Sequence, residues 1–292
     1  MINVLITGSN GQLASCIKDR AKQYKGLNFI YTDYQELDIR NLNHVEGFFK
    51  ANQKIDYCIN CAAYTAVDEA ESDVEKAFEI NAQGPKNLAT ICNEQDTILI
   101  HISTDFVFDG EKNEPYTETD IPKPISVYGA SKLQGEVEIQ KTLKKHFIIR
   151  TSWLYSEHGT NFMKTMLNLA KTRDEISVVS DQIGTPTYAG DLANVILKII
   201  TSNTRSFGLY HYSNEGVASW YDFAKAIFEA VNLKTKINPI ETDAYPTPAK
   251  RPVFSVLDKT KIKKQFNIEI PLWRGNVKSI VNYLYEDLIN IK

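Results

Sequence analysis

The sequence is poor in cysteine, with four among 292 residues, too few for a disulfide framework. Cys58 and Cys61 form a C-x-x-C pair, but no second such pair and no nearby pair of histidines completes a zinc site. The pair falls in the strand-like run 56–62, where residues three apart point to opposite faces of a sheet. We therefore expect two buried structural thiols there, with neither redox nor metal chemistry.

Long apolar runs and basic blocks are also missing, and we expect no leader. No apolar run approaches the ~20 residues that cross a bilayer, and the first residues have neither the charged segment nor the apolar length of a signal peptide. The net charge of −3 argues against a general nucleic-acid binder. With 43% hydrophobic and 24% charged residues, the composition is that of an ordinary globular protein. We expect a cytoplasmic location, with no membrane and no nucleic acid as partner.

What the sequence does contain is a repeated alternation of strand-like and helix-like segments. Strands are expected at 2–7, 28–32, 56–62, 97–103 and 147–151, with helices at 12–24, 42–53 and 73–94 and another beginning near residue 128. Such alternation over short loops indicates a parallel sheet with helices on both faces. The expected fold class is therefore α/β, a Rossmann-type doubly wound parallel sheet with a smaller C-terminal α/β lobe.

The pattern changes after about residue 160. Helices are expected at 162–171, 190–201, 219–231 and 272–289, between shorter strands and proline-containing turns, and Ser219 is a plausible N-cap. We expect a dinucleotide-binding domain over 1–160 plus parts of 185–215. Most of 161–292 would then form a substrate-binding lobe.

A glycine-containing turn follows the first strand directly, as Gly8-Ser9-Asn10-Gly11-Gln12-Leu13-Ala14. Gly8 would permit a tight turn, Gly11 would let backbone amides approach a pyrophosphate, and Ala14 would allow close packing of helix on strand. The spacing G-x-x-G-x-x-A differs from the dehydrogenase G-x-G-x-x-G, and a turn before any helix can contain two glycines. The context of strand, turn and helix therefore carries the prediction of a dinucleotide site.

Asp33 ends the second strand, at about the ~20-residue offset where an acid binds the adenosine ribose in nucleotide-binding folds. The alternative is a solvated loop carboxylate. A 2′-phosphate would place like charge beside Asp33, and the following Tyr34 and Gln35 are neutral. The nearest cation is Arg40, so the sequence slightly favours NADH over NADPH.

Tyr128 and Lys132 are four residues apart at the beginning of a predicted helix, which places a phenol and an ammonium on one face. A free phenol has a pKa near ~10, and a fixed cation beside it would lower this value and make Tyr128 a usable acid at neutral pH. Thr104 follows the fourth strand, where its hydroxyl could hydrogen-bond a substrate carbonyl. Tyr-x-x-x-Lys also occurs by chance, and strand-end hydroxyls are common turn formers.

Together these residues resemble the extended short-chain dehydrogenase/reductases, and within them the dTDP-4-dehydrorhamnose reductase family. The resemblance covers nearly the whole chain in family order. Its blocks are Gly8-x-x-Gly11-Gln12-Leu13, Asn60-x-Ala62-Ala63-Tyr64-Thr65-x-Val67-Asp68, Ser103-Thr104-Asp105-x-Val107-Phe108-x-Gly110, Tyr128-Gly129-x-Ser131-Lys132, Arg150-Thr151-Ser152-Trp153, Asp181-Gln182-x-Gly184-x-Pro186-Thr187 and Arg251-Pro252.

The resemblance implies NAD(P)H-dependent reduction of the C4″ ketone of dTDP-4-dehydro-6-deoxy-L-mannose to dTDP-L-rhamnose, a step in nucleotide-sugar and cell-surface polysaccharide biosynthesis. Tyr128 would protonate the developing alkoxide, Thr104 would hydrogen-bond the same oxygen, and Lys132 would lower the pKa of Tyr128 and hold the nicotinamide ribose.

Spacing and resemblance together give the binding residues. For the dinucleotide they are Gly8, Asn10, Gly11, Gln12, Leu13, Asp33, Asp38, Ile39, Ala62, Ala63, Tyr64, Tyr128 and Lys132. For the nucleotide sugar they are Val67, Thr104, Asp105, Phe106, Trp153 and Arg251. Trp153 could instead be core filling, and Arg251 is expected to pair either with the diphosphate or in a surface salt bridge.

Three residues depart from the family pattern. Phe106 stands where many relatives have a tyrosine, and Ala14 replaces the third glycine. Ser15 and Gly190 stand where some relatives place acidic ligands of a divalent metal that joins two subunits, so we expect no such metal. The resemblance leaves room for a homodimer.

Two other functions stay open. A related nucleotide-4-ketosugar reductase would keep the chemistry and change the sugar. A regulatory dinucleotide-binding subunit of another enzyme would keep the fold without turnover. The intact set of Thr104, Tyr128 and Lys132 favours catalysis.

Overall fold

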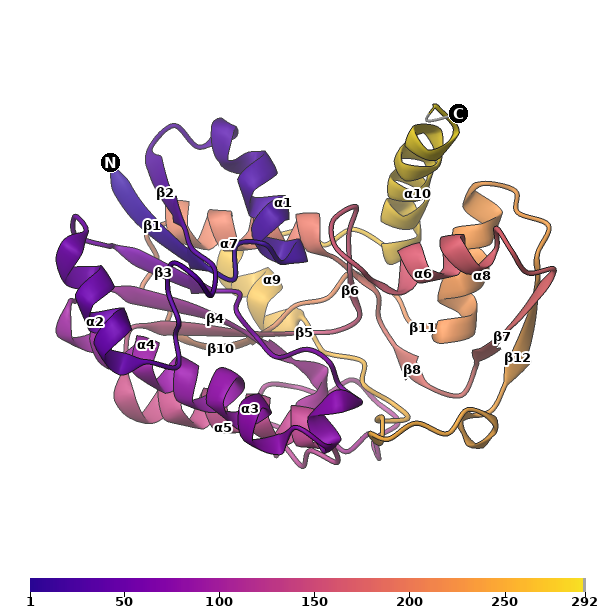
Figure 1. Cartoon of the computed structure of the whole chain (residues 1–292), viewed down its shortest axis with the longest axis horizontal. Coiled ribbons are helices and arrows are strands. Elements are labelled where there is room, and N and C mark those ends of the chain that lie inside the picture. The colour runs from indigo at the N-terminus through magenta and orange to yellow at the C-terminus, as the bar shows by residue number, and fades with distance from the viewer. Residues whose placement is uncertain (291–292) are drawn as a thin grey trace.

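A six-stranded parallel sheet is the centre of the computed structural model, which describes residues 1–290 (Figure 1). Its strand order is β10-β5-β4-β3-β1-β2, and each neighbouring pair is parallel. The strands are β1 (Ile2–Thr7), β2 (Leu27–Tyr31), β3 (Tyr57–Asn60), β4 (Ile98–Thr104), β5 (His146–Thr151) and β10 (Gly208–His211). Strands covered on both faces need apolar residues throughout, and β3 and β5 are buried along their whole length. The predicted Rossmann-type fold is confirmed.

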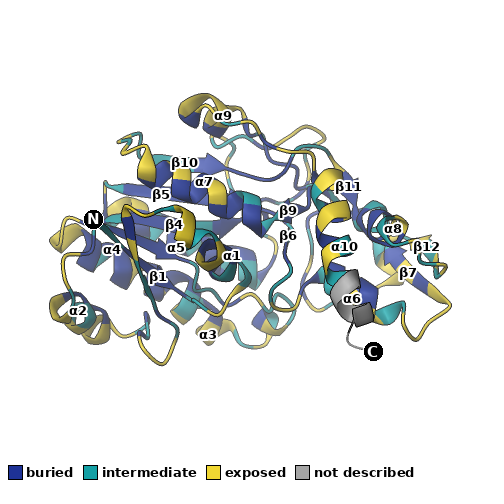
Figure 2. Ribbon diagram, turned by 90° about the horizontal axis from the view of Figure 1, so that it is seen from above, coloured by how far each residue is buried: buried dark blue, intermediate teal, exposed yellow. Residues whose placement is uncertain are grey.

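Helices cover both faces of the sheet, and Figure 2 shows their buried sides turned toward it. One face carries α1 (Gln12–Arg20), α7 (Ala189–Thr201) and α9 (Thr260–Phe266). The other carries α2 (Leu42–Ala51), α4 (Gly84–Glu94) and α5 (Val127–Thr142). Although α7 and β10 come from the second half of the chain, α7 packs against α1 and β10 pairs with β5.

The sheet has its switch point at β1, which lies between β2 and β3. The chain turns there from β1 into α1 through Gly8, whose φ is +65°, and a Cβ on this residue would lie 2.7 Å from the backbone nitrogen of Ala62. Only glycine therefore fits this turn. Gly11 is the N-cap residue of α1, so the first amides of the helix are directed at the crevice where parallel sheets bind nucleotides.

The two cysteines of the C-x-x-C pair point to opposite faces, as predicted. Cys58 is fully buried in the core beneath α2 and α4. Cys61 is only half-buried, because it comes after the end of β3 and lines the cavities described below. The expectation that both thiols are buried is therefore wrong for Cys61.

The single helix predicted over 73–94 is interrupted. It consists of α3 (Val74–Phe78), a π-helical turn over 79–83 and α4. In the π-helical turn, Asn81 accepts a hydrogen bond from the Tyr64 amide at 2.9 Å and donates to the Tyr64 carbonyl and the Ser131 hydroxyl, each at 3.0 Å. Such turns are frequent at functional sites, and this one ties the loop after β3 to α5.

The remainder of the chain forms a smaller lobe with its own core (Figure 1). Its helices are α6 (Phe162–Leu169), α8 (Trp220–Ala230) and α10 (Trp273–Asn290). Its short strands pair as β7 (Glu175–Val179) with β12 (Lys236–Ile240), β8 (Ile183–Gly184) with β11 (Ala218–Ser219), and β6 (Leu154–Tyr155) with β9 (Thr187–Tyr188). The predicted N-cap at Ser219 is confirmed, and Asp222 completes a capping box with it. None of the helices in the described part of the chain combines the length and apolar character that crossing a membrane requires.

Candidate active site

A cavity of about 620 Å³ lies at the carboxyl ends of β4 and β5, between the large sheet and the smaller lobe. A second hollow of about 270 Å³ adjoins it at the beginning of α1. The two share Gly11, Cys61 and Ala63 as lining residues. This is the crevice where open parallel sheets bind ligands.

Most of the predicted site residues meet here. The larger cavity is lined by Asn10, Gly11, Gln12, Leu13, Ala63, Val67, Thr104, Asp105, Phe106, Tyr128, Lys132, Trp153 and Arg251. The smaller hollow is lined by Gly8, Gly11, Asp33, Asp38, Ile39, Ala62 and Ala63.

Tyr64 is the exception, because it lines neither cavity. Its ring is buried, and Asn81 binds both its amide and its carbonyl. The contact of Tyr64 with the dinucleotide therefore stays a prediction. Tyr64 and Asn81 hold the loop that carries Ala62 and Ala63 into the crevice.

Tyr128 lies in the first turn of α5, whose N-cap Ser126 accepts a hydrogen bond from the Gly129 amide at 3.2 Å. The helix approaches the loop after β4 so closely that a Cβ on Gly129 would lie 2.1 Å from the Phe106 carbonyl oxygen. The rings of Phe106 and Tyr128 meet edge to face, 5.5 Å between centroids. Gly129 therefore permits the contact that places the Tyr128 phenol beside Thr104.

The pKa of Tyr128 is raised to about 12, first by burial and also by the charge of Asp105, while a hydrogen bond with Thr104 lowers it. The sequence predicted a lowered value through Lys132. The Lys132 side chain instead donates to the Ile102 carbonyl at 2.7 Å and lies 3.5 Å from His101 Nε2. Burial therefore dominates the pKa of the phenol, and Tyr128 keeps its proton at neutral pH.

Lys132 itself is only 2% exposed. Burial lowers its pKa to about 8, while the charges of Glu136 and Cys61 raise it. The ammonium is thus a buried donor that the Ile102 carbonyl satisfies only in part, with further protons free for a ligand in the cavity.

Asp105 is a buried carboxylate with one unsatisfied oxygen. The side chain is 2% exposed, Oδ1 accepts from the Thr104 hydroxyl at 3.1 Å, and Oδ2 has no hydrogen-bond partner in the described structure. Burial raises its pKa to about 6, against hydrogen bonds that lower it. Ser255 is among the hydrogen-bonding groups that lower this pKa, and Oδ2 itself is covered, so a ligand hydroxyl would reach it only after a local rearrangement of the cavity wall.

Trp153 and Trp220 line the same cavity. Trp153 follows β5 and adopts a left-handed backbone conformation with φ of +46°. Trp220 begins α8, and no sequence motif marks it as a site residue. Only the fold of the smaller lobe brings it to the cavity.

Arg251 combines the two alternatives that the sequence left open. It pairs with both carboxylate oxygens of Asp68, at 3.0 and 2.7 Å, and it also lines the cavity. The surface salt bridge is therefore present, and the contact with a diphosphate stays a prediction.

The smaller hollow has acidic and basic groups side by side. Asp33 accepts hydrogen bonds from the amides of Asn10 at 2.9 Å and Tyr34 at 2.7 Å. Arg40, the nearest cation to Asp33 in the sequence, lines this hollow and is held by Asp38 at 2.9 Å. After Asp33 the chain folds back on itself, so Asp33, Asp38 and Arg40 all line the same hollow.

The divalent metal that joins subunits in some relatives does not fit this chain. Ser15 and Gly190 offer no carboxylate, and a Cβ on Gly190 would lie 2.2 Å from a guanidinium nitrogen of Arg20. A cation thus occupies the place of the missing side chain. The adjacent Asp191 accepts hydrogen bonds from Asn214 and Asn276.

Comparison with known proteins places this cavity in a family. The model described as RmlD substrate binding domain matches residues 2–286. A dTDP-4-dehydrorhamnose reductase of Aggregatibacter actinomycetemcomitans is 44% identical, with 97% of this chain and 99% of that protein covered. The protein of the same name from Escherichia coli is 39% identical, with 97% and 98% covered.

Solved structures agree with the sequence relatives. A dTDP-4-dehydrorhamnose reductase from Clostridium acetobutylicum superposes with a TM-score of 0.92 at 44% identity, covering 97% of this chain and 100% of that one. The Bacillus anthracis protein, solved in complex with NADP, has a TM-score of 0.92 at 40% identity, with 96% and 99% covered. The chain belongs to the dTDP-4-dehydrorhamnose reductase family, as its motif blocks predicted.

Proposed function

We propose that the chain reduces the C4″ ketone of dTDP-4-dehydro-6-deoxy-L-mannose to give dTDP-L-rhamnose, with a reduced nicotinamide dinucleotide as hydride donor. The product would serve nucleotide-sugar and polysaccharide biosynthesis. Full-length similarity to reductases of that name supports this assignment. The observation that carries it is the grouping of Tyr128, Thr104 and the unpaired oxygen of Asp105 on the wall of one cavity.

A bound dinucleotide would supply the hydride, and the chain has the residues that would bind it. The amides at the start of α1 would hold the pyrophosphate, and Lys132 would donate to the ribose hydroxyls next to the nicotinamide. Asp33 would accept from the adenosine ribose. The binding of a nicotinamide dinucleotide is common to the family, and the preference for NADH or NADPH belongs to this proposal, with a slight lean to NADH from Asp33.

The chain's own chemistry is proton donation at the reacting oxygen. Tyr128 would give its proton to the alkoxide that forms as hydride arrives, and a phenol whose pKa is about 12 is fully protonated for that role. Thr104 would donate a hydrogen bond to the same oxygen, where charge develops. Asp105 Oδ2 would accept from a sugar hydroxyl, Trp153 would cover an apolar face of the deoxysugar, and Arg251 would meet the diphosphate.

The test is enzymatic. Purified chain is mixed with dTDP-4-dehydro-6-deoxy-L-mannose and NADH or NADPH, the loss of reduced cofactor is followed by absorbance, and the product is identified as dTDP-L-rhamnose. Tyr128→Phe protein serves as the matched control.

Three results would distinguish the alternatives. Turnover with another nucleotide-4-ketosugar but not with this one would change the substrate and keep the chemistry. Dinucleotide binding without oxidation of cofactor by any ketosugar would contradict the proposal and favour a regulatory subunit. Equal activity in the Tyr128→Phe control would remove Tyr128 as the proton donor.

A further inference from the structure

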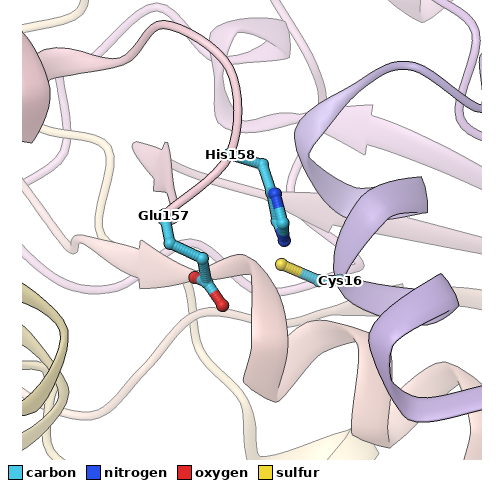
Figure 3. A group of neighbouring side chains, drawn as sticks. All are labelled: Cys16, Glu157 and His158. Atoms are coloured by element: carbon cyan, nitrogen blue, oxygen red, sulfur yellow. The ribbon is translucent and has the colours of Figure 1, made fainter. Parts of the chain in front are cut away.

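Outside the cavity, three side chains of metal-binding type converge where α1 meets the loop that follows β6 (Figure 3). Cys16 comes from α1, and Glu157 and His158 come from the loop. One ligand atom of each lies within 4.8 Å of those of the other two. Among the side chains that the structure describes, no other three cysteine, histidine or acidic residues meet so closely.

We propose that Cys16 Sγ, the Glu157 carboxylate and the His158 imidazole bind one Zn²⁺ ion within a single chain. A mixed set of sulfur, nitrogen and oxygen ligands suits this borderline-soft cation. Mg²⁺ and Ca²⁺ prefer ligand sets made of oxygen alone. The ligand set differs in chemistry from an acidic site between subunits.

Glu157 provides an independent indication of a missing ligand. Its Oε1 accepts a hydrogen bond from the Tyr188 hydroxyl at 3.1 Å, whereas its Oε2 is buried and has no hydrogen-bond partner in the described structure. A buried carboxylate oxygen without a partner is costly, and such groups call for an ion or an ordered water. A Zn²⁺ ion between Glu157 and Cys16 would satisfy it.

Asp19, one turn after Cys16 on α1, has its Oδ2 only 2.6 Å from His158 Nε2. A carboxylate that accepts a hydrogen bond from a ligating histidine fixes the orientation of the ring, so Asp19 would support His158, and water would complete the coordination. Arg20 lies beside the group and donates to the Cys16 carbonyl at 2.9 Å, so the ion and this guanidinium together balance a thiolate and two carboxylates.

The loop is already held in the position that the ion needs. The Ser156 hydroxyl donates to Gln12 Oε1 at 3.0 Å, and the His158 amide donates to Ser156 Oγ at 3.1 Å. Asn161 Nδ2 donates to the same Gln12 oxygen at 2.9 Å. Since Gln12 and Asn161 also line the active-site cavity, an ion at Cys16 would clamp one wall of that cavity to α1.

Binding would displace a proton. Cysteine binds a metal ion as the thiolate. The sulfur–zinc bond forms as the thiol proton leaves to solvent, with no change of oxidation state.

The site was not visible in the sequence. Cys16 is far along the chain from Glu157 and His158, and the three follow no metal-binding spacing.

The experiment uses the full chain, free of any affinity tag, stripped with a chelator and dialysed. Titration calorimetry with Zn²⁺ should give one saturable site per chain, and the melting temperature should rise with Zn²⁺. Co²⁺ in its place should produce a thiolate-to-cobalt charge-transfer band.

Cys16→Ser should abolish the cobalt–thiolate band and weaken Zn²⁺ binding by more than the ~10–100-fold that loss of a supporting residue costs. Cys92→Ser is the matched control, because Cys92 is a buried thiol in the core on the opposite face of the sheet, and it should retain the band and the affinity. His158→Gln removes a partly exposed ligand and should weaken Zn²⁺ binding, which gives a second test if Cys16→Ser does not fold.

Five results would overturn the proposal. The first is the absence of saturable Zn²⁺ binding by the wild-type chain, the second is a cobalt band unchanged in Cys16→Ser, and the third is an unchanged Zn²⁺ affinity in His158→Gln. The fourth is loss of the band in Cys61→Ser alone, which would place the metal at the C-x-x-C pair. The fifth is a doubling of mass on Zn²⁺ addition, seen by sedimentation, which would show an ion shared between subunits.

Discussion

Trp153 and Trp220 stack face to face, with ring centroids 3.7 Å apart and ring planes 9° apart. Trp153 belongs to the segment after β5, and Trp220 is the first residue of α8. A left-handed conformation is unfavourable for a bulky residue such as Trp153, and it persists only where surrounding contacts hold it. The stack provides such a contact, and it joins the sheet to the smaller lobe at the cavity wall.

Trp220→Ala should therefore raise KM for the nucleotide sugar about 3- to 10-fold, because the aromatic pair is worth about 0.5–1.5 kcal/mol beyond its buried area. The dissociation constant for the dinucleotide, measured by fluorescence titration, should stay unchanged. Trp220→Phe is the control that keeps a stacking ring. An equal loss of dinucleotide affinity in Trp220→Ala would show a general disturbance of the fold instead of a role in holding Trp153.

Tyr128→Phe should lower kcat by about 10²–10⁴-fold, the usual contribution of a positioned acid. The ring is retained, so the melting temperature and dinucleotide affinity should hold. Single-turnover kinetics isolates the chemical step from product release. A loss of less than about tenfold would assign proton donation to another group, with Asp105 or a bound water as the next candidate.

Asp105→Asn should lose activity and gain stability near neutral pH. The pKa of Asp105 is raised from 3.8 to about 6 in the folded chain, so the folded state binds more protons than the unfolded state between these values. The free energy of unfolding therefore falls as pH rises from about 4 to about 6, by up to ~3 kcal/mol. Asparagine carries no charge, so the free energy of unfolding of Asp105→Asn should not fall over this pH range.

Urea unfolding of both proteins across this pH range measures the effect. In the wild type, kcat/KM for the sugar should also fall as pH drops through about 6, since protonated Asp105 no longer offers a charged acceptor. This decrease of kcat/KM at low pH should be absent in Asp105→Asn. Parallel stability curves for the two proteins would show that the carboxyl is not the desolvated group.

Asp33→Ser should shift the ratio of kcat/KM for NADH and NADPH toward NADPH by about tenfold, the equivalent of ~1.4 kcal/mol. The Asp33 carboxylate would repel the 2′-phosphate of NADPH, and the substitution removes this negative charge. Arg40→Gln is the paired variant, because Arg40 lines the same hollow. A wild type that prefers NADPH, or an unchanged ratio in Asp33→Ser, would remove Asp33 from the ribose site.

The sequence predicted the elements that depend on local pattern. Parallel strands buried on both faces give continuous apolar runs, and Gly8 and Gly11 mark the turn between β1 and α1, so the Rossmann-type sheet followed directly. Tyr128 and Lys132 were found because one helical turn joins them. Most of the predicted residues line the two cavities because they follow the carboxyl ends of parallel strands, which meet at one edge of the sheet.

The features that the sequence did not predict depend on contacts between distant segments. The direction of the Tyr128 pKa was wrong because burial, which no spacing reveals, outweighs the groups that lower it. The π-helical turn arises because Asn81 bonds to Tyr64 and Ser131, neither of which is near it in the chain. Trp220 and the group around Cys16 depend on how the smaller lobe and the loop after β6 return to the sheet.

The late position of β10 in the chain has a consequence for biosynthesis. Its residues 208–211 pair with β5, with Leu209 opposite Ile148. A nascent chain leaving the ribosome therefore presents β5 as an open strand edge until the smaller lobe's first helix and strands have also emerged. Exposed apolar edges of this kind invite aggregation and binding by chaperones. A fragment that stops near residue 160 would keep this edge permanently open, and it would also lack α7 and α9, which cover one face of the sheet.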